Sequence, residues 1–92
     1  MSNRCRLCGR RTKLGTTAHH LIPRSCHRRK WFRRRFSRQR LQQKIDVCRD
    51  CHRAIHPLIP DEKELGRQYN TPDQLAAHPR MRRFVSWVRK QK

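Results

Sequence analysis

The chain has 92 residues, a hydrophobic content of 34% and a formal net charge of +19, from 25 Lys and Arg against 6 Asp and Glu. A chain of this length is expected to form one small domain with a modest core, which favours a bound metal as an additional stabilising element. It contains no apolar run that could span a bilayer and no signal-peptide pattern, so we expect a cytoplasmic protein that binds a polyanion rather than a membrane.

The first predicted element is a turn built around two cysteines. Cys5 and Cys8 are separated by two residues and followed by Gly9, which relieves the backbone after the turn. This arrangement is typical of a zinc knuckle, here over residues 1–13. The first half of the chain is uniformly cationic because its first acidic residue is Asp46, and a phosphate backbone is the natural ligand of such a segment.

A strand is predicted next, over residues 16–22. The segment is rich in β-branched residues and is bounded by Gly15 and Pro23. It carries two adjacent histidines, His19 and His20, whose side chains diverge because successive strand residues point to opposite faces. One ring can therefore bind a metal while the other reaches a different side of the same bound group.

Residues 24–36 form a cationic connection that also carries three aromatic residues. We expect at least two of these aromatic residues, Trp31, Phe32 and Phe36, to lie in the core, because a small domain needs them there. Cys26 has no partner by spacing and is expected to be a free thiol beside Trp31 or Phe32. The basic side chains are expected to bind phosphates without reading sequence, and this set comprises Arg24, Arg28, Arg29, Lys30, Arg33, Arg34 and Arg35.

Ser37 is predicted to cap a short helix over residues 38–44, and a brief strand is predicted over 45–47. A longer helix should follow over 49–56 and stop at Pro57.

The histidines of this longer helix, His52 and His56, are four residues apart, so both rings project from the same face. A helix uses this spacing to offer two nitrogens to one metal.

The remainder of the chain is predicted to be helical. Acidic residues follow Pro60, where a helix N-terminus favours negative charge. Thr71 and Pro72 form an N-cap followed by proline at the first helical position, and Pro79 opens the last helix. The apolar stripe of that helix comprises Met81, Phe84, Val85 and Val88.

The two cysteine pairs are expected to bind one structural zinc ion. Zinc prefers a closed tetrahedral site of thiolates, which the side chains of Cys5, Cys8, Cys48 and Cys51 can supply. In a reducing compartment such pairs favour metal binding over disulfides, and a redox dithiol is the alternative. We expect removal of the metal to unfold the domain.

The segment from His19-His20 through Pro23-Arg24, followed by Cys48-x-x-Cys51-His52-x-x-x-His56, resembles the HNH endonucleases, also called ββα-metal nucleases. The resemblance covers residues 5–56. It implies an α+β fold in a single domain over residues 1–92. A ββα-metal core, stapled by the four-cysteine zinc site, would occupy residues 5–57, and a helical extension would occupy 58–92.

The resemblance also implies roles for the histidines. His20 would be the general base that activates water, and His19, His52 and His56 would hold a catalytic divalent ion. That ion could be magnesium, manganese, nickel or zinc, and the imidazole ligands favour a transition metal. The enzyme would hydrolyse DNA, with RNA as a second candidate substrate, and leave a 5′-phosphate and a 3′-hydroxyl. The resemblance is to bacterial or phage-encoded proteins.

The chain departs from the family at the Asn that gives HNH its middle letter. Gln43 lies nearest the expected position and is the candidate to orient the base. A second hypothesis is therefore a non-catalytic, zinc-containing nucleic-acid-binding protein, which the charge and the cysteines fit equally well. A membrane-active cationic toxin fits the charge alone. A second, exchangeable metal would support the nuclease.

Overall fold

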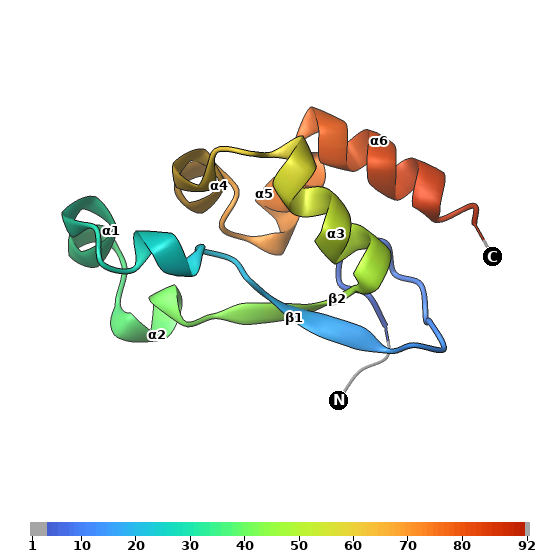
Figure 1. Cartoon of the computed structure of the whole chain (residues 1–92), viewed down its shortest axis with the longest axis horizontal. Coiled ribbons are helices and arrows are strands. Elements are labelled where there is room, and N and C mark those ends of the chain that lie inside the picture. The colour runs from blue at the N-terminus through green and yellow to red at the C-terminus, as the bar shows by residue number, and fades with distance from the viewer. Residues whose placement is uncertain (1–3, 92) are drawn as a thin grey trace.

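The computed structural model describes residues 4–91, which form a small α+β fold with a two-stranded sheet and six α-helices (Figure 1). No helix within this range is both long enough and apolar enough to cross a membrane. In chain order the elements are β1 (Thr16–His20), the 3-10 helix η1 (Arg24–Cys26), α1 (Lys30–Arg35), α2 (Arg38–Leu41), β2 (Lys44–Cys48), α3 (Arg49–Leu58), α4 (Glu62–Gln68), α5 (Pro72–Ala77) and α6 (Pro79–Val88).

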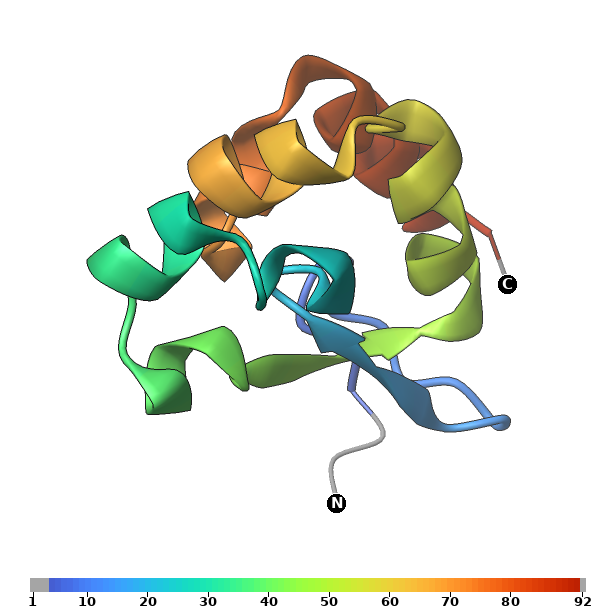
Figure 2. The same ribbon diagram turned by 60° about the vertical axis from the view of Figure 1, so that its left-hand side comes forward.

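The sheet consists of β1 and β2, paired antiparallel. The register places Thr16 opposite Cys48 at one end and His20 opposite Lys44 at the other. The helix α3 follows β2 directly and contacts both strands. Figure 2 shows α3 and the C-terminal helices gathered on one side of the sheet. This arrangement brings the histidines of β1 to face those of α3.

The strand predicted over residues 16–22 ends at His20 instead. Beyond His20 the two chain segments are joined by one more backbone hydrogen bond, which the Leu21 amide donates to the Gln43 carbonyl at 3.2 Å. Leu21 and Ile22 are then both buried. Consecutive residues of a strand point to opposite faces, so burying both side chains requires the strand to end before them.

The connection between the strands is helical, whereas we predicted no helix over residues 24–36. Three short helices, η1, α1 and α2, enclose a cluster of buried side chains, which comprises Ile22, Cys26, Phe32 and Leu41. Trp31 and Phe36 are partly buried and pack against this cluster. Of the three aromatic residues, Phe32 alone is fully buried, so the prediction that at least two lie in the core is met only in part. The packing of the free Cys26 beside Phe32 is confirmed.

The cap at Ser37 is confirmed, because its hydroxyl accepts from the Arg40 amide at 3.1 Å. The helix ends at Leu41 rather than at Lys44, since Lys44 already begins β2.

The predicted end of α3 was wrong by two residues. Pro57 does not stop the helix but lies in its last turn, and the helix runs to Leu58. Proline removes one amide donor from a helix. The loss is tolerated here because the next turn closes without that donor, as the Ile59 amide donates to the Ile55 carbonyl at 2.9 Å.

The C-terminal helices begin as predicted. Asp61 caps α4 by accepting from two backbone amides, and Thr71 caps α5 ahead of a proline at its first turn. The last helix, α6, begins at Pro79 and packs along α3. Of its predicted stripe, Met81, Val85 and Val88 are buried and Phe84 is partly buried.

The C-terminal helices share one hydrophobic cluster with the cysteines of the N-terminal turn. A hydrogen bond from the Arg89 side chain to the Cys8 carbonyl (3.1 Å) joins the end of α6 to that turn. Gly66 of α4 lies against the other cluster, where an added Cβ would approach the Phe32 ring to 2.8 Å. Residues beyond α3 therefore pack into both clusters instead of forming a peripheral tail.

Candidate metal centres

The first candidate centre is a buried cluster of four cysteines. Cys5 and Cys8 come from the N-terminal turn, Cys48 ends β2, and Cys51 lies in the first turn of α3. Their sulfur atoms all lie within 4.8 Å of one another and each residue is at most 4% exposed. Gly9 follows the turn with φ of 76°, a conformation that favours glycine. The predicted knuckles therefore converge into one site that could hold a metal.

Backbone amides and one arginine surround these sulfur atoms. The amides of Leu7 and Cys8 donate to Cys5 Sγ, and the Cys51 amide donates to Cys48 Sγ, all at 3.4 Å. Arg10 donates to Cys8 Sγ at 3.4 Å and to Cys48 Sγ at 3.7 Å. Donors of this kind stabilise thiolates, which are the form that binds metals.

Burial and mutual hydrogen bonding shift the pKa values of three of these thiols. The hydrogen bond from the Cys51 side chain lowers the pKa of Cys5 to about 4, against the opposing effect of burial. That same hydrogen bond, together with burial, raises the pKa of Cys51. Burial raises the pKa of Cys48. A bound cation would favour the thiolate form of these buried thiols.

The second candidate centre is formed by three histidines. His19 comes from β1, and His52 and His56 come from α3. Their ligating nitrogens lie within 4.8 Å of one another. The His19 ring centroid is 5.4 Å from that of His52 and 6.2 Å from that of His56. The sheet register and the four-residue helical spacing thus bring together the three residues predicted as ligands.

The burial of His19 suits this cluster to bind a cation. His19 is 3% exposed, and its Nε2 is buried without a hydrogen-bond partner among the described residues. Such orphaned polar atoms are rare in folded proteins and call for an explanation. Burial, followed by the nearby His52 and His56, lowers the pKa of His19 to about 4. Its ring is therefore neutral at pH 7, and neutral imidazole is the form that binds metals.

Thr17 orients the His52 ring. Its Oγ1 lies 2.7 Å from His52 Nδ1 and also donates to the Val47 carbonyl at 3.4 Å. When the hydroxyl donates to Val47, the Thr17 oxygen accepts from Nδ1–H, and His52 Nε2 carries the free lone pair. Metal-bound histidines are typically fixed in this way through their second nitrogen.

His20 lies at the edge of the same site. With His19, Arg24, His52 and His56 it lines a cavity of about 430 Å³, which we call the histidine cavity. Burial, followed by nearby Lys44, His27 and Arg24, lowers the pKa of His20. The ring is therefore neutral at pH 7 and able to accept a proton. Although the strand alternates, both neighbouring histidines reach one cavity, as the sequence predicted.

Gln43, the predicted orienting residue, points elsewhere. Its Oε1 accepts from Arg40 at 2.8 Å, and no hydrogen bond among residues 4–91 joins its side chain to His20. The neighbouring Gln42 instead lines a smaller cavity beside His20. Asn70 is buried, and its side chain bonds to Arg40 and to backbone carbonyls of α4. Asn70 therefore has a structural role at the end of α4.

All seven basic residues predicted to bind nucleic acid are exposed. They differ in their surroundings. Arg24 lines the histidine cavity, whereas Arg28 and Arg33 line a separate cavity beside it. The Arg35 guanidinium lies over the Trp31 ring at 4.5 Å. The remaining three, Arg29, Lys30 and Arg34, line none of these cavities.

Sequence reasoning missed several residues of these sites. Thr17 could have been found, because it lies two residues before His19 and so shares its strand face. Arg10 carries no pattern that links it to the cysteines. Glu62 lines the histidine cavity and accepts a hydrogen bond from Ser25. This contact depends on how α4 packs against η1, and no local signal predicts it.

The chain is similar to a Bacillus subtilis (strain 168) protein named Uncharacterized protein YisB. The two sequences are 32% identical over 87 residues, which cover 95% of this chain and 74% of YisB. No protein-family model matches the chain. No solved structure matches it.

Proposed function

The chain belongs to the same family as YisB, and we propose that it is a metal-dependent endonuclease of the HNH type that cleaves DNA with low sequence specificity. One observation carries the proposal. The Nε2 of His19 is buried without a hydrogen-bond partner among residues 4–91. One ring nitrogen from each of His19, His52 and His56 lies within 4.8 Å of the others, and His20 lines the same cavity. Buried nitrogens without a partner are rare in folded proteins, and a bound cation would satisfy this one.

The order of elements supports the same assignment. Two antiparallel strands are followed directly by a helix, and the candidate ligands lie on the first strand and on that helix. We therefore assign β1, β2 and α3 as a ββα-metal core, with the later helices as its extension. RNA is a second candidate substrate, because the positive charge recognises any phosphate backbone.

In this proposal the histidines and the arginine of the histidine cavity have different roles in the reaction. A divalent ion held by His19, His52 and His56 would polarise the phosphate and stabilise charge on the leaving oxygen. His20, neutral at pH 7, takes a proton from the attacking water. The water oxygen then bonds to phosphorus as the bond to the 3′-oxygen breaks, and the leaving 3′-oxygen takes a proton from solvent, which gives a 5′-phosphate and a 3′-hydroxyl. Arg24 binds a phosphate oxygen at the rim of the cavity.

We assign the cysteine cluster to a structural zinc ion. Four thiolates in a closed site are typical of zinc, and an iron–sulfur centre is the chemical alternative for four sulfurs. Arg10 would offset part of the negative charge of a four-thiolate zinc site, since it donates to two of the sulfurs. The cluster lies within the main core, so we expect it to support folding rather than chemistry.

A non-catalytic, zinc-containing nucleic-acid-binding protein is the second candidate. The orientation of Gln43 favours it, because the side chain bonds to Arg40 and leaves His20 without the orienting partner that the family places beside its base. The cysteine cluster and the net charge of +19 serve binding as well as they serve cleavage. The histidine cluster favours the nuclease, whereas the orientation of Gln43 favours the binding protein.

Cleavage of supercoiled plasmid tests the proposal. The purified protein is assayed with magnesium, manganese, nickel or zinc and with a chelator control. The variant His20→Ala should abolish nicking while DNA binding persists. His78→Asn is the matched control, because His78 caps α6 outside the site and asparagine can keep that cap. Salt-sensitive DNA binding with no cleavage under any metal would support the second candidate instead.

A further inference from the structure

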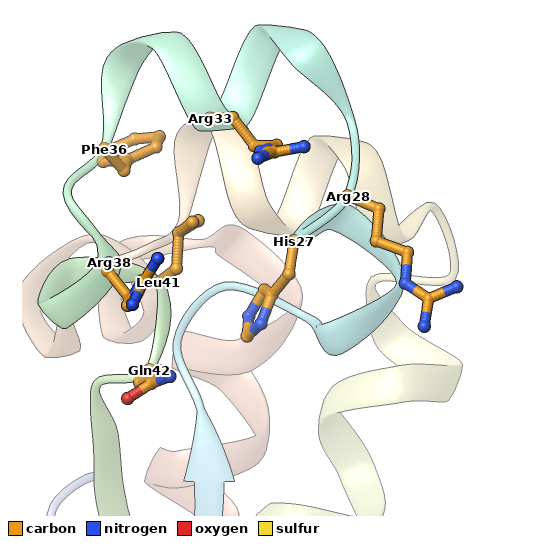
Figure 3. A pocket seen from close by; sticks show the side chains of 7 residues that line it. All are labelled: His27, Arg28, Arg33, Phe36, Arg38, Leu41 and Gln42. Carbon is orange, nitrogen blue, oxygen red and sulfur yellow. The ribbon is translucent and has the colours of Figure 1, made fainter.

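A second cavity lies beside the histidine site, under the connection between the strands. It has a volume of about 400 Å³, within the range of small-molecule sites. We call it the arginine cavity, and Figure 3 shows its lining side chains around the opening. They come from the turn after η1, from α1 and from α2, and include His27, Arg28, Arg33, Phe36, Arg38 and Leu41.

The arginines that line this cavity have no protein partner for their guanidinium groups among residues 4–91. Within residues 4–91, no hydrogen bond or ion pair engages the guanidinium groups of Arg28, Arg33 or Arg38, and no acidic residue lines the cavity. By contrast, Arg35 lies over Trp31, and Arg40 bonds to Asn70 and Gln43. Three positive side chains therefore line one cavity without a counter-charge, and this favours a bound anion.

The cavity also has an apolar wall. Phe36 and Leu41 line it, and Phe36 is held in place by stacking on the buried Phe32 at 6.2 Å between ring centroids. A fixed aromatic ring next to unpaired guanidinium groups is the combination that binds single-stranded nucleic acid, through base stacking and phosphate contacts. A site for an inorganic anion or an acidic peptide would not require that wall.

The arginine cavity adjoins the proposed active site through a third, smaller cavity. His27 and Gln42 line both this cavity and a smaller one, of about 390 Å³, that also contains His20 and Arg24. The His27 and His20 ring centroids are 5.8 Å apart. His27 Nε2 bonds to the Ile22 carbonyl at 2.9 Å, which fixes the ring between the two spaces. A strand whose phosphate lies at His20 can therefore extend into the arginine cavity.

We propose that the arginine cavity binds an unpaired nucleotide that flanks the cleaved phosphate, with its phosphate on Arg33 and Arg38 and its base against Phe36 and Leu41. This inference rests on the proposed function, because the histidine site defines which strand is bound. It gives the enzyme a preference for single-stranded or frayed nucleic acid over an intact duplex.

Binding of a fluorescein-labelled oligothymidylate, followed by anisotropy, tests this inference. The full-length protein is used as purified, without added divalent ions, so that the oligonucleotide stays intact. Arg33→Glu and Arg34→Glu are the matched pair. Both residues are exposed, both belong to α1 and both changes alter the charge equally, but only Arg33 lines the cavity. A third variant, Phe36→Leu, removes the ring and keeps an apolar side chain.

We expect Arg33→Glu to weaken binding about ten-fold more than Arg34→Glu, because it removes a charge-assisted contact at the cavity itself. Phe36→Leu should weaken binding of the oligothymidylate about ten-fold and leave binding of a fully abasic oligonucleotide unchanged. Thermal melting of each variant confirms that it remains folded.

Equal losses in Arg33→Glu and Arg34→Glu would overturn the inference, as would a loss in Phe36→Leu that is the same for the abasic strand. Failure of the wild type to bind the oligonucleotide, or equal competition by polyglutamate, would also overturn it. A plasmid-nicking assay distinguishes a failure of this inference from a failure of the proposed function. If the protein nicks plasmid but Arg33→Glu and Arg34→Glu bind the oligonucleotide equally, only the proposed role of the cavity is refuted. If Arg33→Glu alone weakens binding but the protein does not nick plasmid, only the proposed nuclease activity is refuted.

Discussion

Replacing Thr17 with valine should weaken metal binding at the histidine cluster without removing a ligand. Valine keeps the shape of threonine but cannot accept the hydrogen bond from His52 Nδ1, which is 2.7 Å long in the structure. His52 would then be free to rotate and to place its proton on either nitrogen. Loss of a hydrogen bond to a metal-bound histidine typically costs about 10- to 100-fold in metal affinity, which corresponds to about 1.4–2.8 kcal/mol.

The affinity is measured by calorimetric titration of nickel into protein that retains its cysteine-bound metal. Thr17→Ser is the matched control, because serine keeps the hydroxyl and should bind within a few-fold of the wild type. Metal content before titration confirms that the cysteine site is unchanged in both variants. Wild-type affinity in Thr17→Val would refute the reasoning that Thr17 orients His52. An equal loss in Thr17→Ser would assign the effect to packing instead.

Three further predictions concern stability. Gly66→Ala should destabilise the fold by about 1–3 kcal/mol, because the new Cβ would lie 2.8 Å from the Phe32 ring. Denaturant unfolding measures this change, and Gln68→Ala, at an exposed position of the same helix, is the near-neutral control. In protein that retains its cysteine-bound metal and has no ion at the histidine cluster, burial lowers the pKa of His19 from 6.5 to about 4, so the unfolded state binds more protons between these pH values. The free energy of unfolding should therefore fall by about 3 kcal/mol as pH drops through that window, and a flat profile would contradict the burial of His19. Removing the cysteine-bound metal should unfold the protein, and an unchanged circular dichroism spectrum after metal loss would contradict that expectation.

The candidate ligands could be predicted because their spacing is local. Cysteines two residues apart share a turn, and histidines four residues apart share a helix face. These relations hold wherever the elements pack. His19 and His20 required only the alternation of a strand. The register that places Thr16 opposite Cys48 then brings the local pieces together.

The supporting residues could not be predicted in the same way. Arg10 reaches sulfurs from both knuckles, and Glu62 enters the histidine cavity only because α4 packs against η1. Both contacts depend on tertiary packing. The helices η1 and α1, over residues 24–35, were missed for a related reason. Arginine-rich segments carry little apolar periodicity, and it is the burial of Phe32 and Cys26 that fixes α1 and η1.

The dependence of plasmid nicking on the second metal tests the central claim most directly. Protein that holds one tightly bound ion is titrated with manganese, and the nicking rate is compared with metal occupancy. His56→Ala serves as the site variant, because His56 is exposed and its loss should leave the fold intact. We predict a nicking rate that rises with occupancy of a second ion and is lost in His56→Ala. Nicking that is independent of the second ion, or equal in His56→Ala, would contradict the assignment of the histidine cluster as the catalytic centre.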